Sequence, residues 1–293
     1  MARRIGVTSR LVPWLFLLPA LTLFTVFKFV PMARALTMST QEVRPYLGDQ
    51  WVGGANYAGM AGNPAFLDAF WHTALLAVGS TAGSVVIGFV LALLLEGQAR
   101  HLWFVRSAVF LPVVATMAAV AEVWRLLYYP AATGPINSVL GALGLGPSEF
   151  LNSPHSSLVS ILVMEIWKGA PYDMMIILAG LASIDRALYE AASIDGAGTW
   201  RRLRHVVVPH LKPVFLIVVT LAAVRSMRVF TEVFLLTNGG PDGSSEVLMT
   251  LIYKVGLERS DLGLAAAGSV ALFAVTLALT LLVRLTRGKA ATP

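Results

Sequence analysis

The sequence predicts an all-α, polytopic membrane protein with six transmembrane helices and both termini in the cytoplasm. Three observations predict this fold class: the composition, the number of long apolar stretches, and the distribution of Lys and Arg. Of the 293 residues, 57% are hydrophobic and 13% are charged, whereas soluble domains are about 25% charged. A soluble protein of this size would lack the polar side chains to cover its surface. Lipid must therefore cover much of it, which excludes most soluble enzymes and a disordered chain.

Six stretches are long and apolar enough to cross a bilayer, which takes about 20 mostly apolar residues. They are residues 11–30, 73–95, 107–128, 156–181, 213–236 and 262–283. The second and sixth contain no charged residue, whereas Arg225, Arg228 and Glu232 interrupt the fifth. The first could instead be a signal peptide with Arg3, Arg4 and Arg10 as its positive n-region, but its apolar run is too long and its cleavage site is poor. We therefore expect a retained span.

The distribution of basic residues sets the orientation of these spans. Of the 22 Lys and Arg residues, 13 lie on one side, within residues 3–10, 100–106, 186–212 and 284–289. Four lie on the other side (Arg34, Arg44, Lys254 and Arg259), and the remaining five lie inside spans. Loops rich in Lys and Arg stay in the cytoplasm, so both termini are predicted there. An even number of spans independently requires both termini to lie on the same side. The net charge of +6 therefore reports topology and gives no reason to expect a nucleic-acid partner.

Small residues repeat along the second predicted span, and aromatic residues precede it. The small residues are Ser80, Ser84 and Gly88 and, beside them, Gly79 and Gly83. Such spacing lets helix backbones approach closely, so we expect a packing face, either within the chain or toward a partner. Residues 66–71 are expected to form a separate short helix at the membrane interface.

The predicted inner loop at residues 182–212 contains a short amphipathic helix. Asp185 can cap a helix that begins at Arg186. At 100° per residue, one narrow apolar stripe results, with Glu190 at its edge; the stripe consists of Ala187, Ala191 and Ile194. An exposed stripe of this kind favours a partner protein, and the membrane surface is the alternative.

The rest of that loop has clear stop and start signals. Gly196 and Gly198 are expected to end the first helix. Thr199 can cap a second short helix, and Pro209 is expected to end that helix before the fifth span.

The same loop resembles a known family motif. Glu190-Ala191-Ala192 is followed by three residues, Gly196, nine residues and then Val206-x-Val208-Pro209. This is the spacing of the EAA loop of binding-protein-dependent ABC importer permeases, in which the last element is Ile-x-Leu-Pro. The two valines are conservative replacements. The resemblance implies the fold of a type I ABC importer permease, with residues 1–293 as one transmembrane permease domain and residues 182–212 as its cytoplasmic coupling loop.

Two further segments resemble the sugar-type branch of that family. Residues 230–241 (Phe-Thr-Glu-Val-Phe-Leu-Leu-Thr-Asn-Gly-Gly-Pro) and Gly53-x-Ala-Asn56-Tyr57 are similar to segments of maltose and glycerol-3-phosphate permeases. His72 departs from the Asn that usually stands there. The resemblance implies import of a di- or oligosaccharide delivered by an extracytoplasmic binding protein. A phosphorylated polyol such as glycerol 3-phosphate is the alternative substrate class.

The resemblance also implies an assembly in a bacterial inner membrane. The expected partners are a second permease subunit, two cytoplasmic ABC ATPase subunits and the binding protein. In this family the inner-loop helix sits in a groove of the ATPase and transmits its motion. The residues that carry this coupling role are Glu190, Ala191, Ala192, Asp195, Gly196 and Pro209. Glu190 can accept charge-assisted hydrogen bonds from an ATPase arginine, and Gly196 permits close approach of the two backbones.

The chain has no sequence signature of catalysis. The phosphate loop Gly-x4-Gly-Lys-[Ser/Thr] is missing, so ATP and Mg²⁺ are expected on the partner ATPases and no cofactor on this chain. The spacing of the five His residues indicates no metal site. Two other function classes stay open: a secondary transporter working alone, and a membrane-embedded enzyme that acts on lipid. The coupling loop disfavours the first, and the second would need a polar catalytic cluster at one interface.

Charged residues inside the predicted spans are the remaining candidates for function, because each is costly in lipid unless paired or hydrated. They are Lys28, Glu122, Arg125, Glu165, Lys168, Asp173, Arg225, Arg228 and Glu232. The i,i+3 pairs Glu122/Arg125 and Glu165/Lys168 are expected to neutralise each other. The resemblance implies that the fourth and fifth spans line the substrate path. The candidates to face it are Glu165, Lys168, Arg225, Arg228 and Glu232, with Trp167 and Tyr172 available to stack on sugar rings. Structural pairing between spans is the alternative role for these charges.

Overall fold

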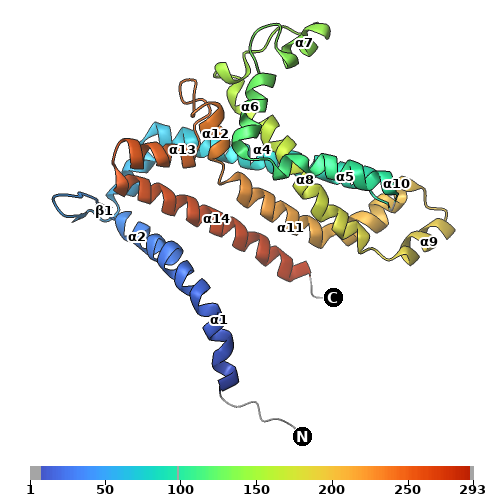
Figure 1. Cartoon of the computed structure of the whole chain (residues 1–293), viewed down its shortest axis with the longest axis horizontal. Coiled ribbons are helices and arrows are strands. Elements are labelled where there is room, and N and C mark those ends of the chain that lie inside the picture. The colour runs from blue at the N-terminus through green and yellow to red at the C-terminus, as the bar shows by residue number, and fades with distance from the viewer. Residues whose placement is uncertain (1–7, 98, 291–293) are drawn as a thin grey trace. The chain divides into compact units, whose positions relative to one another are not determined.

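The computed structural model describes residues 8–97 and 99–290, most of which are helical (Figure 1). The chain divides into two compact units, residues 1–63 with 252–273 and residues 64–251 with 274–293. In the described part of the first unit the elements are α1 (Thr8–Phe24), a π-helical turn η1 (Thr25–Phe29), α2 (Val30–Met38), β1 (Gln41–Glu42), β2 (Gln50–Trp51), α3 (Ala55–Gly62), a π-helical turn η4 (Lys254–Glu258) and the start of α14 (Leu262–Ala290). The two strands form an antiparallel hairpin in which Gln41 faces Trp51.

The first predicted span is a helix that runs past its expected end. Elements α1, η1 and α2 follow one another, and the apolar stretch covers Val12–Met38. The π turn ends two residues before Pro31. At its end, the N–H of Val30 donates to the carbonyl of Thr25. None of the most apolar window of this stretch is buried within the chain, so lipid or another subunit must cover it. Arg3 and Arg4 lie outside the described residues.

The second unit is built around α8. Its elements are α4 (Pro64–Leu94), α5 (Arg100–Val114), α6 (Met117–Leu127), α7 (Pro135–Ala142), a 3₁₀ turn η2 (Phe150–Asn152), α8 (Ser157–Ala182), α9 (Arg186–Ile194), α10 (Thr199–Arg202), a π-helical turn η3 (Leu203–Val207), α11 (Val208–Ser226), α12 (Thr231–Leu236) and α13 (Leu248–Tyr253), which ends at the boundary with the first unit. Helices α4, α5 and α11 each pack against α8. Figure 1 shows α9 and α10 at one end of this group, away from α6 and α7.

Helix α4 begins at Pro64, well before the predicted start at residue 73. Residues 66–71 form its first turns, so the expectation of a separate interfacial helix was wrong. Proline is well suited to the first position of a helix, where no backbone N–H is needed. Within these turns Phe66 is buried, whereas 61% of the Trp71 side-chain surface is exposed. One face of the aromatic segment therefore belongs to the core of the unit.

The small residues of α4 form a packing face within the chain. A Cβ atom on Gly88 would lie 2.9 Å from the carbonyl oxygen of Ala170 in α8, and one on Gly83 would overlap the side chain of Ile166. The hydroxyl of Ser80 donates to that of Ser226 in α11 at 2.6 Å. The predicted close approach is thus confirmed, and its partners are α8 and α11.

The third predicted span, residues 107–128, is not one continuous helix but a bent pair of helices. Helices α5 and α6 meet at 99°. Pro112 lies near the end of α5, and Ala115 and Thr116 are extended, with ψ of 140° and 145°. The hydroxyl of Thr116 then accepts a hydrogen bond from the N–H of Ala119 and starts α6. A proline that disrupts one helix and a Thr cap that begins the next account for the bend.

The fifth predicted span begins earlier and ends earlier than expected. The apolar helix covers Thr199–Ser226, and α12 follows as a separate element. Pro209 does not end a helix as predicted, because the π turn η3 directly before it widens the helix where the N–H donor is missing. Nor does Thr199 cap the second short helix. The N-cap is Gly198, which has no side chain that could cap the helix.

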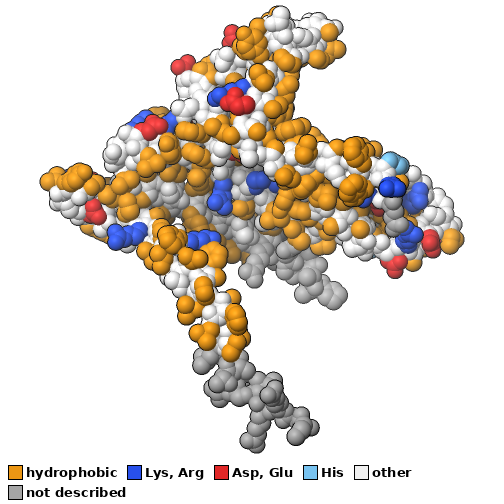
Figure 2. All heavy atoms as spheres, viewed as in Figure 1, with side chains coloured by type: hydrophobic (Ala, Val, Ile, Leu, Met, Phe, Trp, Pro, Cys, Tyr) orange, Lys and Arg blue, Asp and Glu red, His pale blue; other side chains and the backbone are white. Residues whose placement is uncertain are grey.

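By length and composition, four helices among the described residues are able to cross a membrane, and the bent pair α5–α6 would make a fifth. The fourth predicted span corresponds to α8, with bounds within one residue of those expected, but three charged residues lie near its middle. Figure 2 shows hydrophobic side chains over much of the visible face, with charged side chains in several small groups, one of them around α9 and α10. This surface is that of a membrane-embedded protein, as the composition predicts.

Candidate functional site

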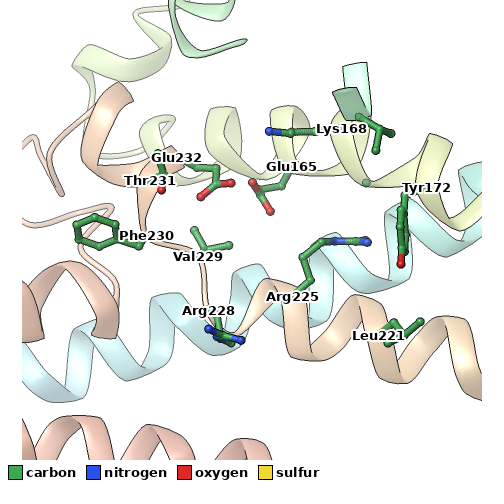
Figure 3. Close-up of a pocket in the computed structure, with 12 residues that line it drawn as sticks. Glu165, Lys168, Tyr172, Leu221, Arg225, Arg228, Val229, Phe230, Thr231 and Glu232 are labelled. Carbon is green, nitrogen blue, oxygen red and sulfur yellow. The ribbon is translucent and has the colours of Figure 1, made fainter. Parts of the chain in front are cut away.

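A cavity of about 410 Å³ lies between α8, α11 and the segment that joins α11 to α12 (Figure 3). Its charged residues are Glu165 and Lys168 from α8, Arg225 from α11, Arg228 from the turn after it, and Glu232 from α12. The rest of the wall consists of Val113, Gly169, Tyr172, Leu221, Val229, Phe230 and Thr231. The structure therefore brings together all five residues that the sequence proposes for a substrate path. Their role in transport stays a prediction.

Helical periodicity explains how these residues meet. Positions 165, 168, 169 and 172 share one face of α8, and positions 221 and 225 share one face of α11. Helix α11 ends at Ser226, and Phe230 has non-helical backbone angles, φ −138° and ψ −63°. This turn folds α12 back so that the carboxylates of Glu165 and Glu232 point toward each other (Figure 3).

Arg225 is held by a buried acid that the sequence analysis left without a partner. The guanidinium of Arg225 lies 3.3 Å from the carboxylate of Asp173, whose side chain is completely buried. It also lies over the ring of Tyr172, 5.5 Å from the centroid. A Cβ atom on Gly169 would come within 2.8 Å of the guanidinium, so a larger residue here would require Arg225 to move. Structural pairing is thus confirmed for Arg225, across two helices whose register the sequence pattern does not give.

Glu165 and Lys168 do not form the predicted i,i+3 pair. The ammonium of Lys168 contacts the sulfur of Met117 at 2.8 Å. Glu165 is buried and makes no hydrogen bond or ion pair with any residue that the structure describes. The prediction failed because the start of α6, placed by the bend after α5, gives the lysine another contact. The second predicted pair forms, with 3.0 Å between Arg125 and Glu122.

The two aromatic candidates are separated. Tyr172 lines the cavity, as proposed for a sugar path. Trp167 does not, because it stacks edge-on against Trp124 at 5.5 Å and lines a different, mostly apolar cavity between α4, α5 and α8. The structure also places Phe230 in the wall. From the sequence, this residue stands out only as the first residue of the family-like segment 230–241.

The predicted coupling helix is present as α9. The carboxylate of Asp185 caps it by accepting from the N–H of Ala187 at 3.0 Å. Gly196 ends it with a left-handed φ of 71°, and the N–H of Ala197 returns to the carbonyl of Ala192 at 2.9 Å. This is a Schellman ending, with Asp195 at the C-cap position.

The face of α9 is open. Glu190, Ala191 and Asp195 are exposed, Ala192 is half-buried, and 87% of the Ile194 surface is accessible. The expected apolar stripe thus has no cover among the described residues. Pro209 lies on α11 and not on this face. Coupling of these residues to an ATPase stays a prediction.

A second cavity, of about 800 Å³, lies beside α9 and was not foreseen. Its wall includes Glu96 from the turn after α4, Arg106 from α5, and Tyr189 and Glu190 from α9. Arg106 donates to the carbonyls of Leu95 and Gly97 and so holds the turn. Burial, and then the nearby Glu96 carboxylate, raise the pKa of Tyr189. Glu96 had no periodic or motif signal that could have pointed to it.

The family-like segments have structural roles. The Nδ1 atom of His72 lies 2.9 Å from the carbonyl of Glu246, and the hydroxyl of Thr73 accepts from the N–H of Leu248 at 2.9 Å. His72 and Thr73 thus fasten the segment after α12 to α4, a contact that an asparagine could also make. Asn56 donates to the carbonyls of Ser39 and Gln41 at 3.0 and 2.9 Å and joins α3 to the hairpin of the first unit.

Comparison with known proteins places this fold in a family. Residues 84–289 match the family described as the binding-protein-dependent transport system inner membrane component. Among its relatives, the Bacillus subtilis protein YurN, described as a probable ABC transporter permease protein, is 32% identical and the alignment covers 94% of this chain and 95% of YurN. The arabinooligosaccharides transport system permease protein AraP of Bacillus subtilis is 29% identical, covering 94% and 88%. The sn-glycerol-3-phosphate transport system permease protein UgpA of Pectobacterium atrosepticum is 32% identical, covering 94% and 93%.

A solved structure agrees with these relatives over nearly the whole chain. It is the crystal structure of a bacterial ABC transporter involved in the import of the acidic polysaccharide alginate, with a TM-score of 0.86, 25% identity, and 98% of both chains covered. The chain belongs to the binding-protein-dependent transport system inner membrane components, the family of ABC importer permeases that its coupling-loop motif resembles.

Proposed function

We propose that this chain is the pore-forming subunit of an ATP-driven importer for a sugar of the di- or oligosaccharide class. The observation that carries the proposal is the cavity of Figure 3, in which five charged residues and Tyr172 line one space between otherwise apolar helices. Charged side chains at membrane depth are retained where they are paired, hydrated or in contact with a ligand. Aromatic rings and paired donors and acceptors are also the groups that bind sugars.

The sugar class is supported by relatives. AraP is described as an arabinooligosaccharide permease and the solved neighbour belongs to an alginate importer, whereas UgpA is described as a glycerol-3-phosphate permease. A phosphorylated polyol is therefore the second candidate substrate. The charges of the cavity bear on the choice between the two classes.

The proposed driving force is ATP hydrolysis on partner subunits. In this proposal Glu190, Ala191 and Ala192 of α9 dock in a groove of the ATPase, and Gly196 lets the two backbones come close. The exposed apolar face of α9 supports a partner at this position. Asp195 and Pro209 belong to the same motif, as the C-cap of α9 and as the proline that follows the π turn. A secondary transporter working alone would have no use for such a face.

The proposed assembly contains two permease chains, two ATPases that bind ATP and Mg²⁺, and an extracytoplasmic binding protein. The family description supports the binding protein. The bent pair α5–α6 as one span and α8 as another, added to the four long apolar helices, would give six spans. Both termini and α9 would then lie on the cytoplasmic side of a bacterial inner membrane, as the positive-inside rule favours.

Isolation of the chain from its native membrane tests this proposal. We expect an ABC ATPase, a second permease and a binding protein to co-purify, and the melting temperature of that binding protein to rise with a particular oligosaccharide. A chain that purifies alone, and that carries solute in liposomes with an ion gradient and no ATP, would instead establish a secondary transporter.

A further inference from the structure

The cavity contains one acid that is buried and aimed into it without a partner. Glu165 is 8% exposed, lines the cavity, and has no hydrogen bond or ion pair among the described residues. Its electrostatic neighbours are Glu232, Arg225 and Lys168. The oxygens of its carboxylate are not among the fully buried atoms without a partner, so they open to the cavity and can accept hydrogen bonds from a ligand there.

The opposite wall presents a donor that is fixed in place. Asp173, behind the cavity wall and fully buried, holds the guanidinium of Arg225 at 3.3 Å, and the ring of Tyr172 lies beside it. The Arg225 side chain remains 35% exposed. An arginine has five N–H donors, so the group keeps donors for a ligand although its charge is already compensated by Asp173.

The formal charges of the site balance. The cations at the wall are Lys168, Arg225 and Arg228, and the acids are Glu165 and Glu232 at the wall with Asp173 behind it. An anionic group entering this space would meet two wall carboxylates beside Lys168 and Arg228, and one arginine that already has its counter-ion. The cations and acids offset each other, so the wall offers a phosphate or a carboxylate no net attraction to repay the loss of its hydration.

We propose that Glu165 and Arg225 form a two-point hydrogen-bonding site that selects an uncharged, hydroxyl-rich ligand, with Asp173 as the positioning residue that holds Arg225. Sugar hydroxyls donate to Glu165 and accept from Arg225, so a pair of them satisfies both walls at once. This inference rests on the proposed function and deepens it, because it favours a neutral oligosaccharide over a phosphorylated polyol.

The absence of cysteine from the chain permits a direct test. Thr231 is exposed at the cavity wall, so T231C in the full chain, in permeabilised membranes with its partners present, supplies a single thiol there. We would measure its rate of modification by three methanethiosulfonates that carry a neutral glucosyl group, an anionic sulfonatoethyl group or a cationic trimethylammonium-ethyl group. Each rate is divided by the rate at L143C, a position directly after α7 whose native leucine is 71% exposed.

We expect the normalised rate of the glucosyl reagent to exceed both charged reagents several-fold. The isosteric substitution Glu165→Gln should reduce this advantage, whereas the control Glu122→Gln, at an exposed acid of α6, should not. Asp173→Asn should raise the ratio of anionic to cationic modification on the order of tenfold, because the uncompensated charge of Arg225 in the same cavity acts oppositely on the two reagents.

Three results would overturn the inference. They are a sulfonatoethyl reagent that reacts fastest in the T231C chain, a glucosyl advantage that survives Glu165→Gln, and a thiol that no reagent reaches. The assay needs neither ATP nor binding protein. If the proposed function is wrong, ATP-driven uptake will be missing while the expected pattern of thiol modification remains. If the inference is wrong, the pattern of thiol modification will differ while ATP-driven uptake remains.

Discussion

At the scale of the residue, Asp173 and Arg225 form an ion pair at the wall of the cavity. The acid is fully buried and the arginine about one-third exposed. Removing one partner of a buried pair leaves an uncompensated charge and costs about 3–5 kcal/mol when both are buried. Solvent around Arg225 reduces that cost, so we expect Asp173→Asn to lower the free energy of unfolding by about 2 kcal/mol.

Thermal unfolding of the detergent-solubilised assembly measures this effect. The double variant D173N/R225Q should recover part of the loss, because it removes the unpaired charge as well. A D173N chain as stable as the wild type, together with a less stable double variant, would show that the pair has no such role.

Gly196 is the residue at which conformation and proposed coupling meet. Its φ of 71° is unfavourable for a β-branched side chain by about 1–2 kcal/mol, so Gly196→Val should shift the end of α9. We expect ATP-driven uptake to fall at least about tenfold, the effect of a change of about 1.4 kcal/mol, while the chain remains at normal levels in the membrane. Uptake per membrane-inserted chain is the measurement.

Two substitutions control this prediction. Gly198 has a φ of −68° and open space around it, so Gly198→Val should be tolerated. Gly196→Asn should lose less uptake than Gly196→Val, because asparagine adopts left-handed angles more readily than other residues, although its side chain still obstructs close approach of the ATPase. Equal loss at positions 196 and 198 would assign the effect to general disruption of the loop.

At the scale of the element, the contact of α4 with α8 determines the stability of the second unit. A Cβ atom on Gly88 would meet the carbonyl of Ala170 at 2.9 Å and the N–H of Met174 at 3.0 Å, and backbone atoms cannot rotate away. We expect Gly88→Ala to lower the free energy of unfolding by about 1–3 kcal/mol, observed as a lower melting temperature in detergent. Gly59→Ala in α3, with open space around it, should be neutral or stabilising by up to about 1 kcal/mol. A larger loss at Gly59 would contradict this packing account.

Element boundaries show where reasoning from sequence succeeds and where it fails. The α8 span and the cap of α9 at Asp185 were predictable, because an apolar length and a local cap are both written in consecutive residues. The 99° bend between α5 and α6 was not, since an apolar run satisfies the same hydropathy whether it is straight or bent. Pro112 was the available signal, and it does not by itself give an angle.

At the scale of the whole molecule, the sequence predicts the membrane class, the family and the set of cavity residues, but not their partners. Helical spacing places Glu165 and Lys168 on one face of α8 and Arg225 on one face of α11. The pairing of Arg225 with Asp173 depends on how two helices are set against each other. The loss of the expected Glu165–Lys168 pair depends on where the bent helix α6 brings Met117. Interactions between elements were the part that local patterns could not supply.

Uptake into proteoliposomes would show whether this chain forms part of an ATP-driven pore for a neutral sugar. The co-purified assembly would be reconstituted with its binding protein and with the labelled oligosaccharide that raises the melting temperature of that protein. We predict that accumulation requires ATP on the side of the vesicle membrane where α9 lies, and that it also requires the binding protein. We predict that Gly196→Val abolishes this accumulation. Accumulation that proceeds without ATP on an ion gradient, or that occurs for glycerol 3-phosphate and not for the neutral oligosaccharide, would contradict the account.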